Sequence, residues 1–348
     1  MRIALVTDAW TPQVNGVVRT LQQIVTMLRA DGHTLEIISP DRFTTVPCPG
    51  YPEIKLVVAP WTLATMLRDF GPDAVHIATE GPLGWAARNW CVRKKKGFNS
   101  SFHTRFPEYI AVRTGLSPDL IWPILNRFHA PSNRVLVATQ GLEDELKAHG
   151  IQQTHRWSRG VDLKRFGPDK PMHPAMTSLE RPVQLYVGRV AIEKNIEAFL
   201  DNPHPGSKVV VGDGPALAAL RNRYADVLFT GVLEGDALAS AYRSADVFVF
   251  PSLTDTFGLV MIEALACGVP VAGFPITGPL DIVGATGSGT IRGFNARVGA
   301  VADDLASAVG MALTAKRDDC VRYAQNFSWD ASYQQFLVAL NILQDSEK

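Results

Sequence analysis

Cysteines are few and long apolar runs are missing, and these two absences exclude several classes of protein. The 348 residues include four cysteines that lie far apart, with no CxxC pair, so neither a disulfide framework nor a zinc site is predicted. No run approaches the roughly 18 apolar residues of a membrane span. Asp8 interrupts the apolar start of the chain, which argues against a signal peptide. These features are typical of a cytoplasmic protein in a reducing compartment.

An excess of charge is also missing. The 34 basic and 34 acidic residues cancel, and a net charge of zero argues against nucleic acid as a partner. The glycine-rich residues 284–293 lack the GK[ST] ending of a P-loop. The eight histidines have no metal-ligand spacing, and there is no DxD pair, so the sequence predicts no metal and no other cofactor.

What the sequence does contain is an alternation of strand and helix patterns. Residues 2–7 are continuous in apolar character, as in parallel strands that are buried on both faces, and residues 72–77 are predicted as another strand. The alternation predicts an α/β fold with doubly wound parallel sheets. Residues 167–181 are rich in proline and lack periodicity, which indicates a linker. We therefore expect domains at 1–166 and 182–325, followed by a last helix at 326–348.

The stretch from 252 to 275 is the most informative part of the chain. A predicted strand at 245–251 runs into a loop, and a helix follows from Gly258 to Cys267. Unpaired N–H groups and the helix dipole make such a helix start suitable for a phosphate. Asp255 and Glu263 bracket it, and their carboxylates suit sugar hydroxyls. Two alternatives stay open: Asp255 or Thr256 is only an N-cap, and Glu263 is exposed or a structural hydrogen-bonding group.

Three other strand ends carry candidate residues. Gly16 lies where the first strand turns into a helix, so the backbone there could approach a phosphate, although an ordinary turn is the alternative. Arg189 and Lys194 follow the strand at 183–187 and offer positive charge to a diphosphate, unless they are simply solvated. His103 closes another strand, at an edge where ligands bind in such sheets; a structural histidine is the alternative.

Together these segments resemble retaining GT-B glycosyltransferases of family four. The matching signatures are the acidic-x7-acidic pair Asp255 and Glu263, a G-R-x-x-x-E-K-[GN] run at 188–195, and an S-x-H-T-x-x-P-E-Y run at 101–109. Asp255 replaces the usual glutamate of this family. The resemblance implies two Rossmann-like domains that face each other across a cleft, with the last helix packing back on the first domain.

The resemblance also implies a role for each site residue. Asp255 would bind the donor sugar, Glu263 the ribose, and Arg189 and Lys194 the diphosphate, with His103 beside the reacting bond. The implied catalytic set is His103, Arg189, Lys194 and Asp255. The implied donor-binding set is Gly16, Gly188, Val232, Thr256, Phe257, Gly258, Leu259 and Glu263. The implied acceptor-side set is Glu80, Thr104, Glu108 and Tyr109.

A basic segment at 88–96 suggests a membrane contact. It holds five basic residues and no acidic one, and aromatic residues lie nearby, a composition suited to anionic lipid headgroups. Residues 118–129 add apolar bulk at Trp122 and Phe128 that we expect to be exposed. The membrane-contact set is Arg93, Lys94, Lys95, Lys96 and Trp122. A solvated helix end is the alternative.

The segments at 79–84, 103–109 and 157–162 look most like enzymes that glycosylate diacylglycerol, of the sulfoquinovosyl or glucuronosyl type, and like related mannosyltransferases. We therefore expect a retaining glycosyltransferase that moves a sugar from a nucleotide sugar, with a UDP-sugar favoured, to a lipid hydroxyl such as that of diacylglycerol. A GDP-mannose-dependent α-mannosyltransferase acting on a lipid-linked or saccharide acceptor is the alternative. A nucleotide-sugar-binding protein without turnover is a third hypothesis, because Asp255 departs from the family pattern. The expected location is the cytoplasm or the cytoplasmic face of the membrane.

Overall fold

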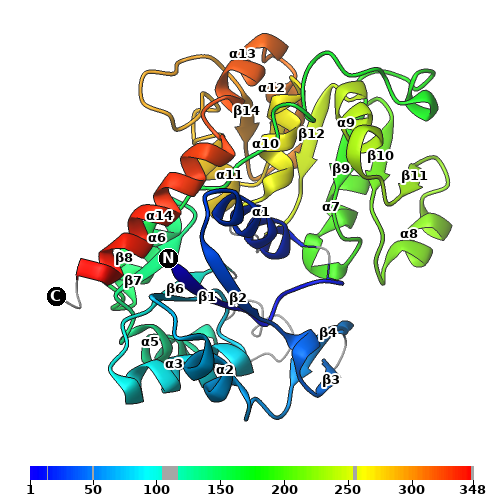
Figure 1. Cartoon of the computed structure of the whole chain (residues 1–348). Coiled ribbons are helices and arrows are strands. Elements are labelled where there is room, and N and C mark those ends of the chain that lie inside the picture. Colours follow the sequence, from blue (N-terminus) through cyan, green and yellow to red (C-terminus); the bar gives the residue numbers. More distant parts are fainter. Residues whose placement is uncertain (14, 49–50, 104–116, 254–256, 346–348) are drawn as a thin grey trace. The chain divides into compact units, whose positions relative to one another are not determined.

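The computed structural model describes residues 1–13, 15–48, 51–103, 117–253 and 257–345 (Figure 1). The chain divides into two compact units, each with its own six-stranded sheet. The first unit combines Met1–Arg159 with the chain from Asp330 onward, and the second is Gly160–Trp329. Within the described ranges, no helix has the length and apolar character that crossing a bilayer requires.

The first sheet has the order β2-β1-β5-β6-β7-β8, and its strands pair in parallel. Its strands are β1 (Arg2–Val6), β2 (Thr34–Ile38), β5 (Ala74–Ile77), β6 (Asn99–Phe102), β7 (Arg134–Val137) and β8 (Thr154–Arg156). The helices of this part are α1 (Gly16–Ala30), α2 (Leu63–Phe70), α3 (Pro82–Lys94), α5 (Trp122–His129) and α6 (Gln140–Ala148). The strand order reverses between β1 and β5, which is where ligands bind in doubly wound sheets.

Alternate residues of β1 enter two separate cores, because successive side chains of a strand point to opposite faces. Ile3 and Leu5 share one core with α1, whereas Ala4 and Val6 share the other with α2 and α3. Both faces of the sheet are therefore covered, which is why β1 is apolar from Ile3 to Val6.

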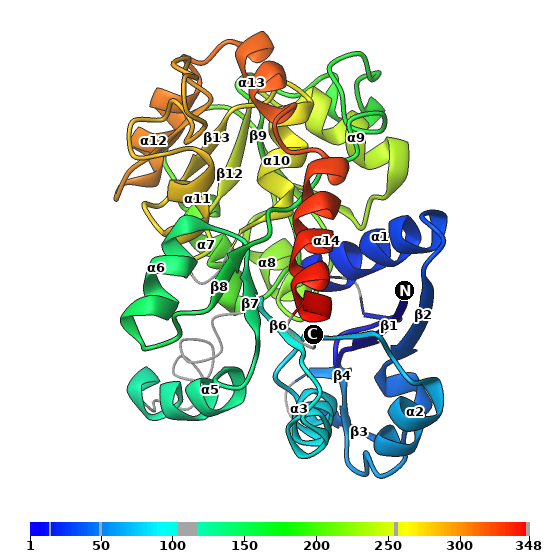
Figure 2. The same cartoon turned by 60° about the vertical axis from the view of Figure 1, so that its left-hand side comes forward.

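The last helix, α14 (Trp329–Asp345), packs on the first unit, as the family resemblance implied. Phe336 and Leu340 are fully buried in the core that α1 also lines, and Figure 2 shows α14 in red alongside α1. The phenol of Tyr333 donates to Asp31 Oδ2 at 2.8 Å, and the amide of Asn99 donates to Ala339 O at 2.7 Å. These contacts fix the helix along its length.

A two-stranded antiparallel sheet, β3 (Thr45–Cys48) with β4 (Tyr51–Val57), was not predicted. Prolines within this stretch disfavour a strand inside a larger sheet. They are tolerated here because each strand has only one partner.

The second sheet has the order β11-β10-β9-β12-β13-β14, again parallel. Its strands are β9 (Gln184–Val187), β10 (Lys208–Val211), β11 (Leu228–Gly231), β12 (Val247–Phe250), β13 (Val271–Gly273) and β14 (Gly299–Val301). Its helices are α7 (Ile196–Leu200), α8 (Leu217–Arg223), α9 (Gly235–Ser244), α10 (Leu259–Ala266), α11 (Thr277–Ile282), α12 (Leu305–Ala312) and α13 (Arg317–Ala324). The strand order reverses between β9 and β12.

The proline-rich residues 167–181 lie within the second unit. The backbone N–H of His173 donates to Ser244 Oγ at 2.7 Å, and Arg181 pairs with Asp246 at 2.8 Å. Both contacts tie this segment to the end of α9 and the start of β12.

Candidate active site

In the second unit, two loops leave the sheet side by side at the reversal of strand order. One follows β9 and carries Arg189 and Lys194, and the other follows β12 and leads to α10. The side-chain amide of Asn195 donates to Pro251 O at 3.1 Å and joins the two loops. The structure therefore places the predicted cationic loop next to the loop that precedes Glu263.

Close backbone packing holds the cationic loop in shape. A Cβ atom on Gly212 would lie 1.9 Å from Gly188 O, so the turn after β10 needs glycine to pack against this loop. The phenol of Tyr186 donates to Arg189 O at 2.8 Å. Arg189 and Lys194 are both half-buried. The loop thus presents two cations from a fixed backbone.

Glu263 lies on α10, and its side chain is buried, with 7% exposed. The phenol of Tyr242, on α9, donates to its Oε2 at 2.9 Å. A buried carboxylate requires such a donor, because removing the charge from water is costly. The exposed alternative for Glu263 is thus excluded. The hydrogen bond to Tyr242 gives Glu263 a structural role, and this role does not exclude that Glu263 also binds a ligand.

Among the described residues, no side-chain cap is found at the start of α10. Its N-cap is Gly258, with a φ of 78°, and Phe257 beside it is buried while Leu259 is half-buried. Val232 follows β11 and is 60% exposed. It lies at the same sheet edge, but β10 separates β11 from β9.

Some predicted site residues lie outside the described ranges. They are Thr104, Glu108, Tyr109, Asp255 and Thr256.

In the first unit, Asp8 follows β1 and caps a helix from a distant part of the chain. Its carboxylate accepts from the N–H groups of Leu83 and Gly84, at 2.9 and 3.3 Å, and from the Thr79 hydroxyl at 2.9 Å. Burial raises the pKa of Asp8 even though these hydrogen bonds oppose the rise. This role of Asp8 was not predicted from the sequence. The available signal was that the N-cap of α3 is Gly81, which has no side chain to cap the helix.

Glu80 also lies at this edge, just after β5. Its Oε1 is 3.3 Å from His129 Nε2, and both side chains are almost fully buried. Ser100 Oγ lies 2.8 Å from the other ring nitrogen, Nδ1. Gly16 is the first residue of α1, after the N-cap Asn15. The switch point therefore gathers Asp8, Glu80 and the start of α1.

His103 follows β6 and is 8% exposed. Its Nδ1 lies 2.8 Å from Nη2 of Arg159, a residue that the sequence analysis did not assign to the site. Burial, and secondly the charge of Arg159, hold the pKa of His103 well below its usual 6.5. His103 is therefore neutral at pH 7.

Some residues of the membrane-contact set are exposed in the structure and others are buried. Arg93, Lys94 and Lys95 are exposed at the end of α3, and Lys96 is half-buried. The expectation of exposed bulk at Trp122 and Phe128 is wrong, because these side chains are 4% and 0% exposed.

The reason lies in the packing of α5. Trp122 stacks on His149 with ring centroids 3.8 Å apart, and the apolar residues three apart along the helix face inward. The large apolar side chains that this segment exposes are instead Leu120 and Ile124, at 62% and 52%.

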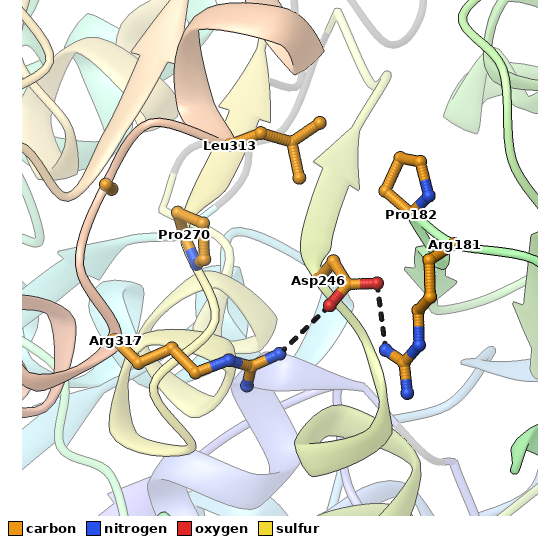
Figure 3. A pocket seen from close by; sticks show the side chains of 7 residues that line it. Arg181, Pro182, Asp246, Pro270, Leu313 and Arg317 are labelled. Atoms are coloured by element: carbon orange, nitrogen blue, oxygen red, sulfur yellow. Dashed lines mark hydrogen bonds and ion pairs between the residues drawn. The ribbon is translucent and has the colours of Figure 1, made fainter.

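A hollow of about 350 Å³ lies on the second unit, away from the candidate residues (Figure 3). Pro182, Asp246 and Pro270 line it, and each precedes a strand, so the hollow is at the amino edge of the sheet. Asp246 pairs there with Arg181 and Arg317, at 2.8 and 3.4 Å. This ion-pair cluster lies at the amino ends of the strands. The loop that carries Lys194 and the loop that precedes Glu263 both lie at the opposite, carboxyl ends.

Comparison with known proteins agrees with this geometry. The profile for Glycosyltransferase Family 4 matches residues 14–165, and that for Glycosyl transferases group 1 matches residues 181–314. A GDP-mannose-dependent alpha-mannosyltransferase of Mycolicibacterium smegmatis is 33% identical over 84% of this chain and 84% of its own length. The chain belongs to glycosyltransferase family 4. The sulfoquinovosyl transferase of Arabidopsis thaliana is 30% identical to this family 4 chain, over 79% of the chain and 60% of the plant protein.

Solved structures show that this family 4 chain has the predicted GT-B fold. The sucrose-phosphate synthase of Thermosynechococcus elongatus superimposes with a TM-score of 0.75 at 21% identity, and the match covers 99% of each chain. An Anabaena protein in complex with UDP gives a TM-score of 0.68 at 16% identity, over 98% of this chain and 100% of the other.

Proposed function

We propose that this family 4 protein is a retaining glycosyltransferase that moves a sugar from a nucleoside diphosphate sugar to a lipid hydroxyl. One observation carries the proposal: the half-buried cations Arg189 and Lys194 and the loop leading to buried Glu263 share one switch point. Cations suit a diphosphate, and a desolvated carboxylate suits the hydroxyls of a ribose.

In this proposal the diphosphate is the leaving group, and its charge is the main obstacle to the reaction. Arg189 and Lys194 stabilise that charge, together with the N–H groups at the start of α10, so no metal ion is needed. An anionic leaving group needs no proton from a general acid. The departing phosphate oxygen accepts the proton of the acceptor hydroxyl on the same face of the sugar, which retains the anomeric configuration.

For the donor, the family relatives favour GDP-mannose over the UDP-sugar that the sequence resemblance favoured. Three relatives at 31–33% identity are named GDP-mannose-dependent alpha-mannosyltransferases. We therefore propose GDP-mannose as the first donor to test and a UDP-sugar as the second.

For the acceptor, the names of more distant relatives point to lipids. An alpha-monoglucosyldiacylglycerol synthase of Streptococcus pneumoniae is 26% identical, over 78% of this chain and 70% of its own length. A lipid acceptor would place the enzyme at the cytoplasmic face of a membrane. Arg93, Lys94 and Lys95 are exposed and available for anionic headgroups there.

Thermal unfolding with GDP, UDP, GDP-mannose and UDP-sugars tests donor binding, because a bound ligand raises the melting temperature. We expect GDP and GDP-mannose to give the largest shifts. Sugar transfer to diacylglycerol vesicles and to soluble saccharides then tests the acceptor. A shift without transfer to any acceptor would favour the non-catalytic binding protein, and no shift with any nucleotide would contradict the proposal.

A further inference from the structure

Arg159 and His103 form a buried side-chain pair at the end of the first sheet. Arg159 is 5% and His103 8% exposed, and Nη2 of the arginine lies 2.8 Å from Nδ1 of the histidine. From the sequence, a role was predicted for His103 but not for Arg159. The pair matters because its two members have different hydrogen-bonding capacities.

A guanidinium group has five N–H donors and no acceptor, so the histidine nitrogen that faces it must accept. Burial lowers the pKa of Arg159 to about 9, which still leaves it protonated at pH 7. Nδ1 of His103 therefore carries no hydrogen. A neutral imidazole has a single ring hydrogen, and here it must be on Nε2.

We propose that Arg159 is a positioning residue that fixes His103 as the Nε2–H tautomer, so that His103 offers the site a hydrogen-bond donor. This inference rests on the proposed function for the identity of the acceptor atom, which would be an oxygen of the donor sugar or of its phosphate. In this tautomer Nε2 has no lone pair. His103 therefore does not act as a general base toward the acceptor hydroxyl.

Arg159 is itself held by Trp157. Its Nη1 donates to the Trp157 carbonyl at 2.7 Å, and the guanidinium carbon lies 4.4 Å from the indole centroid. Trp157 is fully buried and packs on Phe336, with ring centroids 5.0 Å apart. Among the described residues, no carboxylate offsets the effect of burial on Arg159. Its position therefore depends on the tryptophan, and its charge stays directed at His103.

Arg159 and His76 are the titratable groups whose charges act on His103. Burial and the charge of Arg159 lower the pKa of His76 to about 3, so His76 is neutral at pH 7. Arg159 is then the one permanent charge of the three. Replacing Arg159 should therefore raise the pKa of His103 and allow either ring nitrogen to carry the hydrogen.

The test is ¹⁵N NMR of protein labelled in its histidine rings, with the His103 signals assigned from their loss in His103→Gln. In the wild type we expect a hydrogen on Nε2 and none on Nδ1, with ¹⁵N shifts that do not change between about pH 6 and 8. In Arg159→Met, which keeps length without a donor, we expect shifts of both nitrogens that average over the two neutral tautomers, because burial still disfavours the protonated ring. Arg159→Lys, which restores a cationic donor, should return the spectrum toward that of the wild type.

A wild-type hydrogen on Nδ1 would overturn the proposal, and this observation requires neither an Arg159 variant nor enzyme activity. Unchanged His103 shifts in a folded Arg159→Met protein would also overturn it. A purely structural arginine would lower the melting temperature without altering the tautomer. The outcome is independent of sugar transfer, so the proposed function and this inference fail separately.

Discussion

The phenol of Tyr242 and the carboxylate of Glu263 form a buried hydrogen bond of 2.9 Å between α9 and α10. Tyr242 is itself fixed by aromatic neighbours, with ring centroids 5.8 Å from Phe166 and 5.9 Å from Phe248. A carboxylate that is buried without donors would be strongly destabilising. Tyr242 therefore contributes to orienting the Glu263 side chain near the reversal of strand order.

Replacing Tyr242 by phenylalanine should destabilise the protein by about 1–3 kcal/mol, because a buried carboxylate oxygen loses its donor. Urea unfolding measures the change. The matched control is Tyr224→Phe, since Tyr224 donates to Asp201 at 2.7 Å on the exposed surface of the same unit. Its loss should cost less. Equal costs for the two variants would contradict the role given to Tyr242.

Acid should weaken the first unit through His76. Burial, with a smaller effect of Arg159, lowers the pKa of His76 from 6.5 to about 3. A group with a lowered pKa in the folded state contributes stability that is complete above about pH 6.5 and is lost as the pH falls toward 3. The free energy of unfolding should therefore fall by up to about 1.4 kcal/mol per pH unit below 6.5 from this residue.

The measurement is the free energy of unfolding as a function of pH in the wild type and in His76→Gln, which does not titrate. His103 contributes in the same direction in both proteins, so the difference between the two slopes isolates His76. Parallel curves between about pH 6.5 and 5 would show that His76 does not carry this dependence.

The sequence predicted which residues lie at the strand ends, but it did not predict which side chains contact one another. Gly188, Arg189 and Lys194 could be placed because a mostly apolar strand pattern, at 183–187, ends just before them. The Tyr242 contact with Glu263 joins two helices, and the Arg159 contact with His103 spans 56 positions. Neither pairing leaves a local pattern, so neither could be predicted.

Trp122 shows a second limit. An aromatic residue beside a basic segment suits a membrane contact, but helical spacing does not tell which face of α5 packs inward. The inward face of α5 is determined by the stacking of Trp122 on His149, a contact that forms only in the folded chain. Similarly, Asp8 was interpreted only as a break in an apolar run, since the helix that it caps begins more than 70 positions later.

The last helix should contribute strongly to the stability of the first unit. Phe336 is fully buried and packs on Trp157 and His76, with ring centroids 5.0 and 4.9 Å away. Phe336→Ala should cost about 3–5 kcal/mol, the usual range for a buried phenylalanine. Val338→Ala on the same helix is the control, since Val338 is 51% exposed and should change stability by no more than about 0.5 kcal/mol. Similar unfolding midpoints for these two variants would argue against this packing.

Binding to anionic vesicles should depend on the end of α3. Neutralising Lys94, Lys95 and Lys96 to glutamine should weaken sedimentation with such vesicles, by about 1 kcal/mol for each lysine near the surface. Added salt should weaken the binding of the wild type in the same way. Neutralising the exposed Arg29 and Arg68 is the control and should leave binding intact. If the triple variant binds as the wild type does, the basic segment is only a solvated helix end.

The most direct test of the central claim is transfer of a radiolabelled sugar from GDP-mannose or a UDP-sugar to a lipid, compared between the wild type and Lys194→Ala. We predict labelled glycolipid from the wild type, and a loss of about 2–4 kcal/mol of transition-state stabilisation in kcat/KM for the variant. Arg223→Ala, which removes an exposed cation paired with Glu197, should transfer normally. A wild type that transfers no sugar from any of these donors, or a Lys194→Ala protein with normal turnover, would contradict the account.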